Sequence, residues 1–206
     1  SDGNIYLAGV TDGNLDGITN SGSYDIFLMK YNSSGTKQWT KLSGNSYSNY
    51  ALGVVVDPNS NDIYVTGYNV GTLDGQANSG GNDILLMKYN SSGTKQWTRQ
   101  TGTSLSDNGR GIGVDSFGSI YVAGGTHGGL DGNSNLGSTD AFIMKYNSSG
   151  TKQWTRQFGT SSSEASWALT VDSSDNIYVV GYTFGGLDGN TFAGGDGDVF
   201  LVKYST

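Results

Sequence analysis

Short apolar runs recur along the whole chain, separated by clusters of Gly, Asn, Asp and Ser. Four kinds of run, here called A to D, follow one another in a fixed order. In residues 25–31, Phe27 and Met29 fall on one face of an extended chain, because alternate side chains share a face. Ile26 and Leu28 fall on the other face. Runs this short, rich in β-branched and aromatic residues and bounded by turn residues, predict β-strands.

The runs occur fourteen times, in the order BCD, ABCD, ABCD, ABC. Both faces of the B and C runs are apolar, so each small sheet must be covered on both sides. A ring of blades meets that requirement, because each sheet lies between two others and only short edges remain. The expected strands are A at 51–57, 109–115 and 167–172; B at 5–9, 63–67, 120–124 and 177–181; C at 25–31 and from residues 83, 140 and 198; D at 38–41 and from residues 96 and 153.

Nearly the same decapeptide stands at residues 31–40, 89–98 and 146–155, at steps of 58 and 57 residues. Such a period indicates one supersecondary unit copied in tandem. The sequence therefore predicts an all-β protein, a single β-propeller arc or ring over residues 1–206, built from four-stranded blades of ~57 residues. The predicted blades are a partial blade at 1–42, complete blades at 51–100 and 109–157, and a partial blade at 167–206.

The repeated pattern is apolar-Val-Asp, Asn-Ile-Tyr-Val-x-Gly, Asp-x-Phe-Leu-x-Lys-Tyr and Ser-Gly-Thr-x-Gln-Trp. It resembles the SBBP (seven-bladed β-propeller) repeat of bacterial exported and surface proteins, over essentially the whole chain. The resemblance implies a propeller fold and an extracellular or cell-surface location. It does not imply an activity, because one fold serves many functions.

Fourteen strands amount to three and a half blades, with no A strand in the first blade and no D strand in the last. Three arrangements remain open: a fragment of a longer propeller, two arcs that close one ring, or a small four-bladed ring with two thin blades. An open arc exposes apolar blade faces, which usually mark an interface. We therefore expect self-association or further blades.

The chain has 206 residues, a formal net charge of −7 and no Cys. Without Cys there is no disulfide, thiol nucleophile or cysteine metal site. The negative charge disfavours nucleic acid and anionic membranes as partners. No apolar run approaches the ~20 residues of a membrane helix, so we expect no membrane insertion.

Charge is distributed unevenly between the segments. No Lys or Arg lies between a B strand and the start of the next C strand, and ten of the eleven basic residues lie on C, D or their joining turn. This pattern predicts an acidic face at the end where the B–C and D–A loops emerge, suited to a cation or a basic partner. The acidic residues are Asp12, Asp16, Asp25, Asp74, Asp83, Asp131, Asp140, Asp188, Asp196 and Asp198.

Each B–C loop carries Leu-Asp-Gly. The structural interpretation is that Leu plugs the blade end, Asp caps a turn and Gly adopts positive φ. The first loop also fits D-x-N-x-D-G-x-x-N, which is similar to the calcium loops of integrin-type propellers. Alternate oxygen ligands at this spacing can converge on one hard cation. The predicted calcium ligands are Asp12, Asn14, Asp16 and Asn20, the last standing where a carboxylate is usual.

Aromatic residues suggest packing in some places and binding in others. Trp39, Trp97 and Trp154 recur in D and are expected to pack between blades. Trp167 replaces a small residue at the start of an A strand, where it could fill a gap between blades or stack on a sugar. The expected ligand face comprises Tyr47, Tyr50, Trp167 and Phe184.

Catalytic chemistry has little support in the sequence. The single His, His127, lies in a Gly-rich loop without a second His, a Cys or a serine elbow. The leading hypothesis is therefore a non-catalytic scaffold that binds a protein partner through the B–C and D–A loops. A lectin-like carbohydrate-binding propeller is the alternative, and an enzyme is third.

Overall fold

The computed structural model describes residues 3–205, which form fourteen β-strands in four antiparallel sheets. The sheets have three, four, four and three strands. The predicted all-β class and strand order are confirmed. The strands are β1 (Ile5–Thr11), β2 (Asp25–Tyr31), β3 (Lys37–Ser43), β4 (Asn49–Val56), β5 (Ile63–Val70), β6 (Asn82–Tyr89), β7 (Lys95–Thr101), β8 (Asp107–Val114), β9 (Ile120–Thr126), β10 (Asp140–Tyr146), β11 (Lys152–Phe158), β12 (Glu164–Val171), β13 (Ile177–Thr183) and β14 (Asp198–Tyr204).

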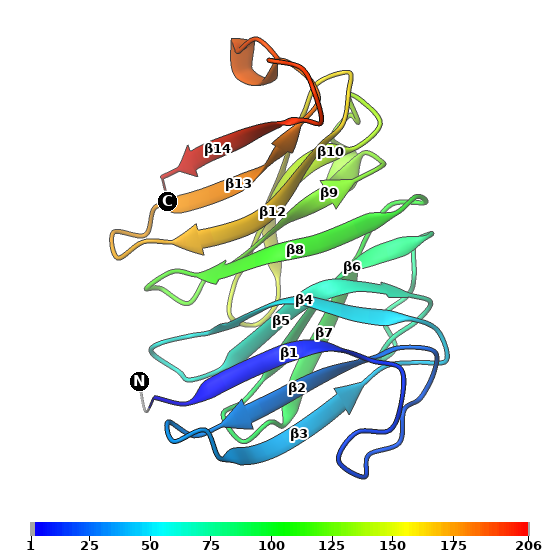
Figure 1. Cartoon of the computed structure of the whole chain (residues 1–206), viewed down its shortest axis with the longest axis vertical. Helices are drawn as coiled ribbons and strands as arrows, with labels where there is room; N and C mark the ends of the chain where they lie inside the picture. Colours follow the sequence, from blue (N-terminus) through cyan, green and yellow to red (C-terminus); the bar gives the residue numbers. More distant parts are fainter. Residues whose placement is uncertain (1–2, 206) are drawn as a thin grey trace.

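The four sheets, numbered sheet 1 to sheet 4 along the chain, stack in sequence order (Figure 1). Sheet 1 (β1–β3) lies at one end of the arc, and sheet 4 (β12–β14) at the other. Two short 3₁₀ turns, η1 (Leu130–Gly132) and η2 (Leu187–Gly189), lie in the loops that precede β10 and β14. No helix in the described part of the chain has the length and apolar character needed to span a membrane.

Three apolar clusters form the core, and each fills the space between two successive sheets. Tyr64, Ile84 and Leu86 of sheet 2 pack against Ile120 and Phe142 of sheet 3, among others. Equivalent clusters join sheets 1 and 2 and sheets 3 and 4. The internal sheets are thus buried on both faces, as their apolar pattern predicts.

The tryptophans of the outer strands belong to these clusters, as predicted. Trp39, Trp97 and Trp154 are half-buried, and each packs on a different cluster. The ring of Trp97 also lies against the turn of the next sheet, where a Cβ on Gly150 would come within 3.1 Å of it. Each Trp therefore ties its own blade to the following one.

The first strands of sheets 2, 3 and 4 lie side by side (Figure 1). They approach closely, because a Cβ at Gly111 of β8 would lie only 2.5 Å from the backbone nitrogen of Leu169 in β12. Each of these strands also carries a β-bulge, which leaves one residue without a partner in the ladder. The bulge residues are Leu52, Arg110 and Trp167.

The side chains of the bulge residues are exposed to solvent rather than packed between blades. Leu52 is 45% exposed and Trp167 is 60% exposed. The expectation that Trp167 fills a gap between blades is therefore wrong. An extra residue in a strand re-aims its own side chain, and this effect is not visible in the hydrophobic pattern.

Candidate functional site

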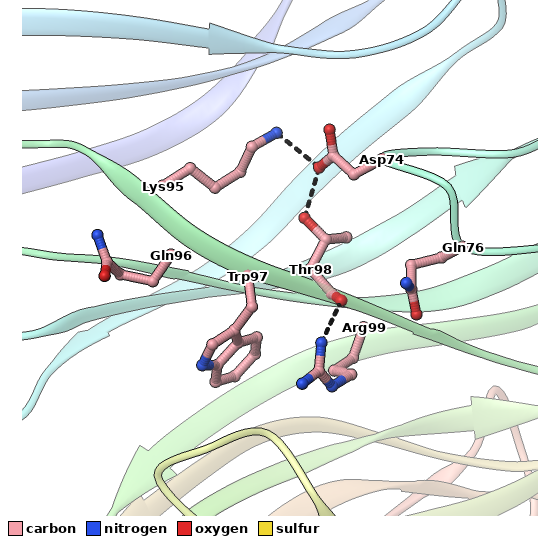
Figure 2. Close-up of a pocket in the computed structure, with 7 residues that line it drawn as sticks. All are labelled: Asp74, Gln76, Lys95, Gln96, Trp97, Thr98 and Arg99. Atoms are coloured by element: carbon pink, nitrogen blue, oxygen red, sulfur yellow. Dashed lines mark hydrogen bonds and ion pairs between the residues drawn. The ribbon is translucent and has the colours of Figure 1, made fainter.

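In sheets 1, 2 and 3, the outer strand is bound to the loop that precedes its neighbouring strand. In sheet 2, the Lys95 ammonium lies 2.6 Å from the Asp74 carboxylate, and the Thr98 hydroxyl donates to the same group at 2.5 Å. Figure 2 shows the side chains of Lys95 and Thr98 pointing to Asp74. These residues line a shallow hollow of about 370 Å³. Trp97 and Arg99 also line this hollow, and the Arg99 guanidinium lies 5.0 Å from the Trp97 ring.

This arrangement, here called the Asp–Lys–Thr clamp, recurs in sheets 1 and 3. Asp16 binds Lys37 and Thr40, and Asp131 binds Lys152 and Thr155. Burial opposes ionisation of Asp74, but the hydrogen bonds from Lys95 and Thr98 outweigh it and hold its pKa below the ordinary value. The hydrogen bond from Lys37 likewise lowers the pKa of Asp16.

The clamp corrects the expected role of the Leu-Asp-Gly segment. Leu73 is buried and Gly75 has a φ of 75°, as predicted. Asp74, however, adopts positive φ itself, at 51°, and reaches across to the outer strand instead of capping its own turn. Asp tolerates this left-handed conformation better than most residues. The sequence carries a signal for the clamp, since Lys follows the Asp by 21 residues in all three copies.

The predicted acidic face is weaker than a count of carboxylates indicates. Asp25, Asp83 and Asp140 lie at or next to the start of β2, β6 and β10, the strands that precede the outer strand of each blade, and have no exposed surface. Each accepts a backbone N–H of the preceding loop, as Asp83 does from Ser79 at 2.7 Å. Three more of the ten carboxylates are those of the clamp, each held by a lysine. The exposed carboxylates that remain include Asp12, Asp188 and Asp196.

The buried carboxylates form pairs at the junctions between sheets. Asp83 and Asp107 both contact the loop at Gly102, whose Cβ would lie 2.3 Å and 3.0 Å from their oxygens. Burial, with a contribution from the charge of Asp107, raises the pKa of Asp83. At the first junction the place of Asp107 is taken by Asn49. These pairs are not visible in the sequence, because the two members lie on different blades.

The four predicted calcium ligands lie in one loop but are already engaged with other groups. The Asn14 Oδ1 accepts the Asn20 N–H at 3.0 Å, and the Asn20 side chain donates to the Thr11 carbonyl at 3.1 Å. Asp16 faces Lys37 rather than the loop interior. A cation in this loop would have to compete with that ammonium for Asp16, while Asp12 is exposed. The calcium site stays a prediction.

The four aromatic residues of the expected ligand face divide into two groups. Tyr50 stacks on Tyr68 at 4.8 Å, and Tyr47 is 56% exposed beside Gly71 in the same blade. Trp167 and Phe184 belong instead to sheet 4 and its loop, where both contact the ring of Tyr182 edge-on, at 5.5 and 5.4 Å. Because sheet 3 lies between the two groups, they do not form one site.

His127 is exposed in its loop, as expected. Its Nδ1 lies 2.9 Å from the Ser106 carbonyl, and its Nε2 lies 3.3 Å from the Thr139 hydroxyl. It lines a hollow of about 510 Å³ together with Leu105. Among residues 3–205, no three His, Cys, Asp or Glu side chains group as metal ligands.

Four stacked antiparallel sheets with a repeated clamp define a tandem-repeat β-propeller protein. Residues 96–131 and 153–188 match the family model SBBP, described as a beta-propeller repeat. These two stretches are therefore SBBP repeats, and the resemblance drawn from the sequence is confirmed there. Each matched stretch begins on an outer strand and ends at the Leu-Asp-Gly turn of the next blade.

Two curated relatives match the chain over a part of their own length. The chain is 28% identical over 225 residues to the regulatory protein FlaEY of Caulobacter vibrioides, across 97% of this chain and 24% of that protein. It is 26% identical over 197 residues to an uncharacterized WD repeat-containing protein of Acanthamoeba polyphaga mimivirus, across 76% of this chain and 14% of the relative. The chain thus spans a quarter or less of their length.

Among solved structures, the chain is similar to a luciferin-regenerating enzyme. The TM-score is 0.47 and the identity is 14%, over 97% of this chain and 57% of the enzyme. A likeness at this level carries no argument about activity.

Proposed function

We propose that this β-propeller module is a non-catalytic interaction scaffold that associates through the open faces of its two end sheets. The supporting observation is a difference in exposure between equivalent positions. Leu201 of sheet 4 is 68% exposed and Val199 is 80% exposed, whereas Ile143 and Ala141, their equivalents in sheet 3, are fully buried. Large exposed apolar surfaces on a soluble protein usually mark contacts.

The two open faces are complementary. The open face of sheet 1 carries Ile5 and Leu7, which are 53% and 50% exposed. In sheets 2 and 3 the equivalent residues pack against the preceding blade, as Ile63 and Val65 do. The open face of sheet 4 is the kind that packs against the following blade. A head-to-tail contact with a second copy, or with a further blade, would therefore repeat a geometry that the arc already contains three times.

The loop face is a weaker candidate for the contact surface than the sequence indicates. Most of its carboxylates are buried or held by lysines, so little net field remains to recruit a basic partner. The scaffold role thus shifts from the loops to the end sheets, and an extracellular or surface setting remains part of the proposal.

The test is the mass of the protein in solution. Light scattering at micromolar concentration is expected to show species above the 21.6 kDa of one chain. Leu201→Asp is expected to return the protein to the monomer, because it places a charge on the open face. Leu136→Asp is the matched control, since Leu136 is 56% exposed on a loop, and it should leave association unchanged. A parent that stays monomeric contradicts the proposal.

A lectin-like role is the second candidate, favoured by the exposed group of Trp167, Tyr182 and Phe184. Exposed aromatic faces can stack on sugar rings, and Trp167 is 60% exposed. A glycan array would identify a ligand, and Trp167→Ala should abolish its binding while Tyr47→Ala, in the separate group on sheet 2, should not. The absence of any glycan signal would leave the scaffold role as the better proposal.

A further inference from the structure

The bulge residues of the first strands form a row across three sheets. Leu52, Arg110 and Trp167, here called the bulge row, occupy equivalent places in β4, β8 and β12, which lie side by side (Figure 1). These strands approach closely beside the bulges, because a Cβ at Gly53 would lie 2.8 Å from the Arg110 carbonyl oxygen. The approach of β8 to β12 described above is as close. Side chains that leave neighbouring strands at equivalent places therefore lie next to one another.

The exposure of the bulge row does not come from the ends of the arc. Arg110 belongs to sheet 3, which packs against sheet 2 on one face and sheet 4 on the other, and it is exposed. Leu52 belongs to sheet 2, which also has a sheet on each face, and it is 45% exposed. A bulge re-aims its extra residue away from the regular alternation of the strand. The 60% exposure of Trp167 follows the same rule.

The only exposed charge on these three fully described strands is that of Arg110. The other two charged residues, Asp107 and Glu164, have no exposed surface. Among residues 3–205, the Arg110 guanidinium has no ion pair and no hydrogen-bond partner. The fork of an arginine fits the two oxygens of a carboxylate. The bulge row is thus suited to a carboxylate ligand, although the net charge of the chain is negative.

Aromatic rings lie beside this guanidinium. Burial raises the pKa of Tyr68, and the charge of Arg110 opposes the rise, so the two side chains are near each other. On the next first strand, the Trp167 ring contacts the Tyr182 ring edge-on at 5.5 Å, which holds the indole while most of its surface stays exposed. The repeat requires neither the charge nor the indole, because Leu52 occupies the same place in sheet 2.

We propose that the bulge row binds an acidic polysaccharide, with one sugar ring stacked on Trp167 and the carboxylate of a neighbouring uronic acid held by Arg110. The inference rests on the lectin-like candidate for Trp167 and adds the chemical class of its ligand. A uronic-acid chain presents a ring and a carboxylate in each unit, which matches an indole and a guanidinium on adjacent strands. An acidic peptide of Glu residues offers the charge without the ring.

The experiment probes an array of uronic-acid oligosaccharides of different linkage with the whole chain, each beside its carboxyl-reduced, neutral form. At least one acidic member is expected to bind about tenfold more tightly than its reduced form, because the carboxylate adds charge-assisted hydrogen bonds. High salt should shrink this preference, since it screens exposed charges. A polyglutamate peptide should not displace the oligosaccharide. Displacement at equal concentration of carboxylates would show that charge alone is recognised and would overturn the proposal.

Arg110→Gln separates the charge from the stacking. It is expected to lower the affinity for the acidic member about tenfold, to that of the reduced form, and to leave binding of the reduced form unchanged. Trp167→Ala should weaken binding of both forms. Lys41→Gln, which removes a positive charge from the outer strand β3, is the matched control and should change either affinity less than twofold. Thermal melts check folding, which should be kept because the ladder skips both bulge residues.

The possible failures are distinguishable. Equal binding of the acidic and reduced forms by the parent, or an Arg110→Gln variant that keeps the preference, overturns the proposal. Neutral glycans that bind through Trp167 without any preference for acidic members would leave the lectin-like candidate standing alone. If no glycan of either kind binds, both fail. Self-association through the end faces is measured separately, by the mass of the protein in solution.

Discussion

Sheets 3 and 4 have the same strand pattern but different surroundings. Ile143 in sheet 3 has no exposed surface, whereas its equivalent in sheet 4, Leu201, is 68% exposed. On the opposite face both sheets are buried, as Phe142 and Phe200 show. The repeat thus sets which residues are apolar, and a neighbouring blade decides whether they are covered. Stability in such proteins is close to a sum of units and the interfaces between them.

The largest expected effect compares an internal sheet with an end sheet. Phe142 and Phe27 are equivalent, and each covers the glycine of the neighbouring strand, Gly124 or Gly9. Phe142→Ala is expected to cost about 3–5 kcal/mol, the usual loss for a buried aromatic. Phe27→Ala should cost roughly 1–2 kcal/mol, because its ring is only half-buried. Urea unfolding measures both, and equal losses would show that the end sheets are as well packed as the internal ones.

A smaller loss is expected at the junction between blades. Trp97→Ala should destabilise by about 2–3 kcal/mol, below the value for a fully buried aromatic because the ring is half-buried. Part of the loss comes from the Arg99 guanidinium above the ring. Gln96→Ala, at the exposed neighbouring position, is the control. A loss below about 1 kcal/mol would show that the Trp contributes little to holding blades together.

Replacing a paired buried carboxylate is expected to increase the stability of the protein rather than to lower it. Because the pKa of Asp83 is raised in the fold, the folded state holds a proton that the unfolded state releases. Stability should therefore fall as the pH rises from about 4 through the folded pKa. Asp83→Asn removes this dependence and should stabilise by about 1 kcal/mol at pH 7, since the amide can donate towards Asp107. Asp25→Asn is the control, because Asp25 lies beside Asn49 rather than a second carboxylate, and it is expected to give no gain in stability. Thermal melts of both variants and the parent from pH 4 to 7 measure the difference.

The smallest expected effect is that of calcium on the first loop. With a Kd of about 1 mM, typical of weak extracellular sites, 1 mM calcium should stabilise by about 0.4 kcal/mol. Asp12→Asn should abolish the gain, whereas Asp131→Asn in the third loop should leave it intact. A melting temperature that calcium does not change would show that these loop residues form a turn and do not bind calcium. The other three loops have neither of the residues equivalent to Asp12 and Asn14.

The strands were predictable because each blade repeats the same short-range signals. Alternation at Phe27 and Met29, with Gly-rich turns on both sides, identifies a strand without knowledge of its neighbours. Boundaries shifted by a residue or two, as at β4, which begins at Asn49 rather than at residue 51. The bulge at Leu52 was not foreseen, because an extra residue changes the backbone and leaves the composition of the strand unchanged.

The charged surface was less predictable because it depends on distant pairs. Asp74 lies in a loop 21 residues before Lys95, and only the fold brings the two together. Asp83 counts as an acidic loop residue in the sequence, yet it has no exposed surface and accepts hydrogen bonds from the Ser79 N–H and the Gln100 side chain. A count of charges therefore overestimated the field of the loop face. The constant Asp-to-Lys spacing in three copies was the signal that could have revealed the pairing.

The bulges give the arc a set of positions that are free to change. Leu52, Arg110 and Trp167 occupy the same place in three successive first strands, and their chemistry differs completely. The ladder skips each of them, so replacing one should leave the strand pairing intact. They amount to three equivalent attachment points along the row of first strands. A binding surface could be selected or engineered there, one blade at a time, without altering the repeat that carries it.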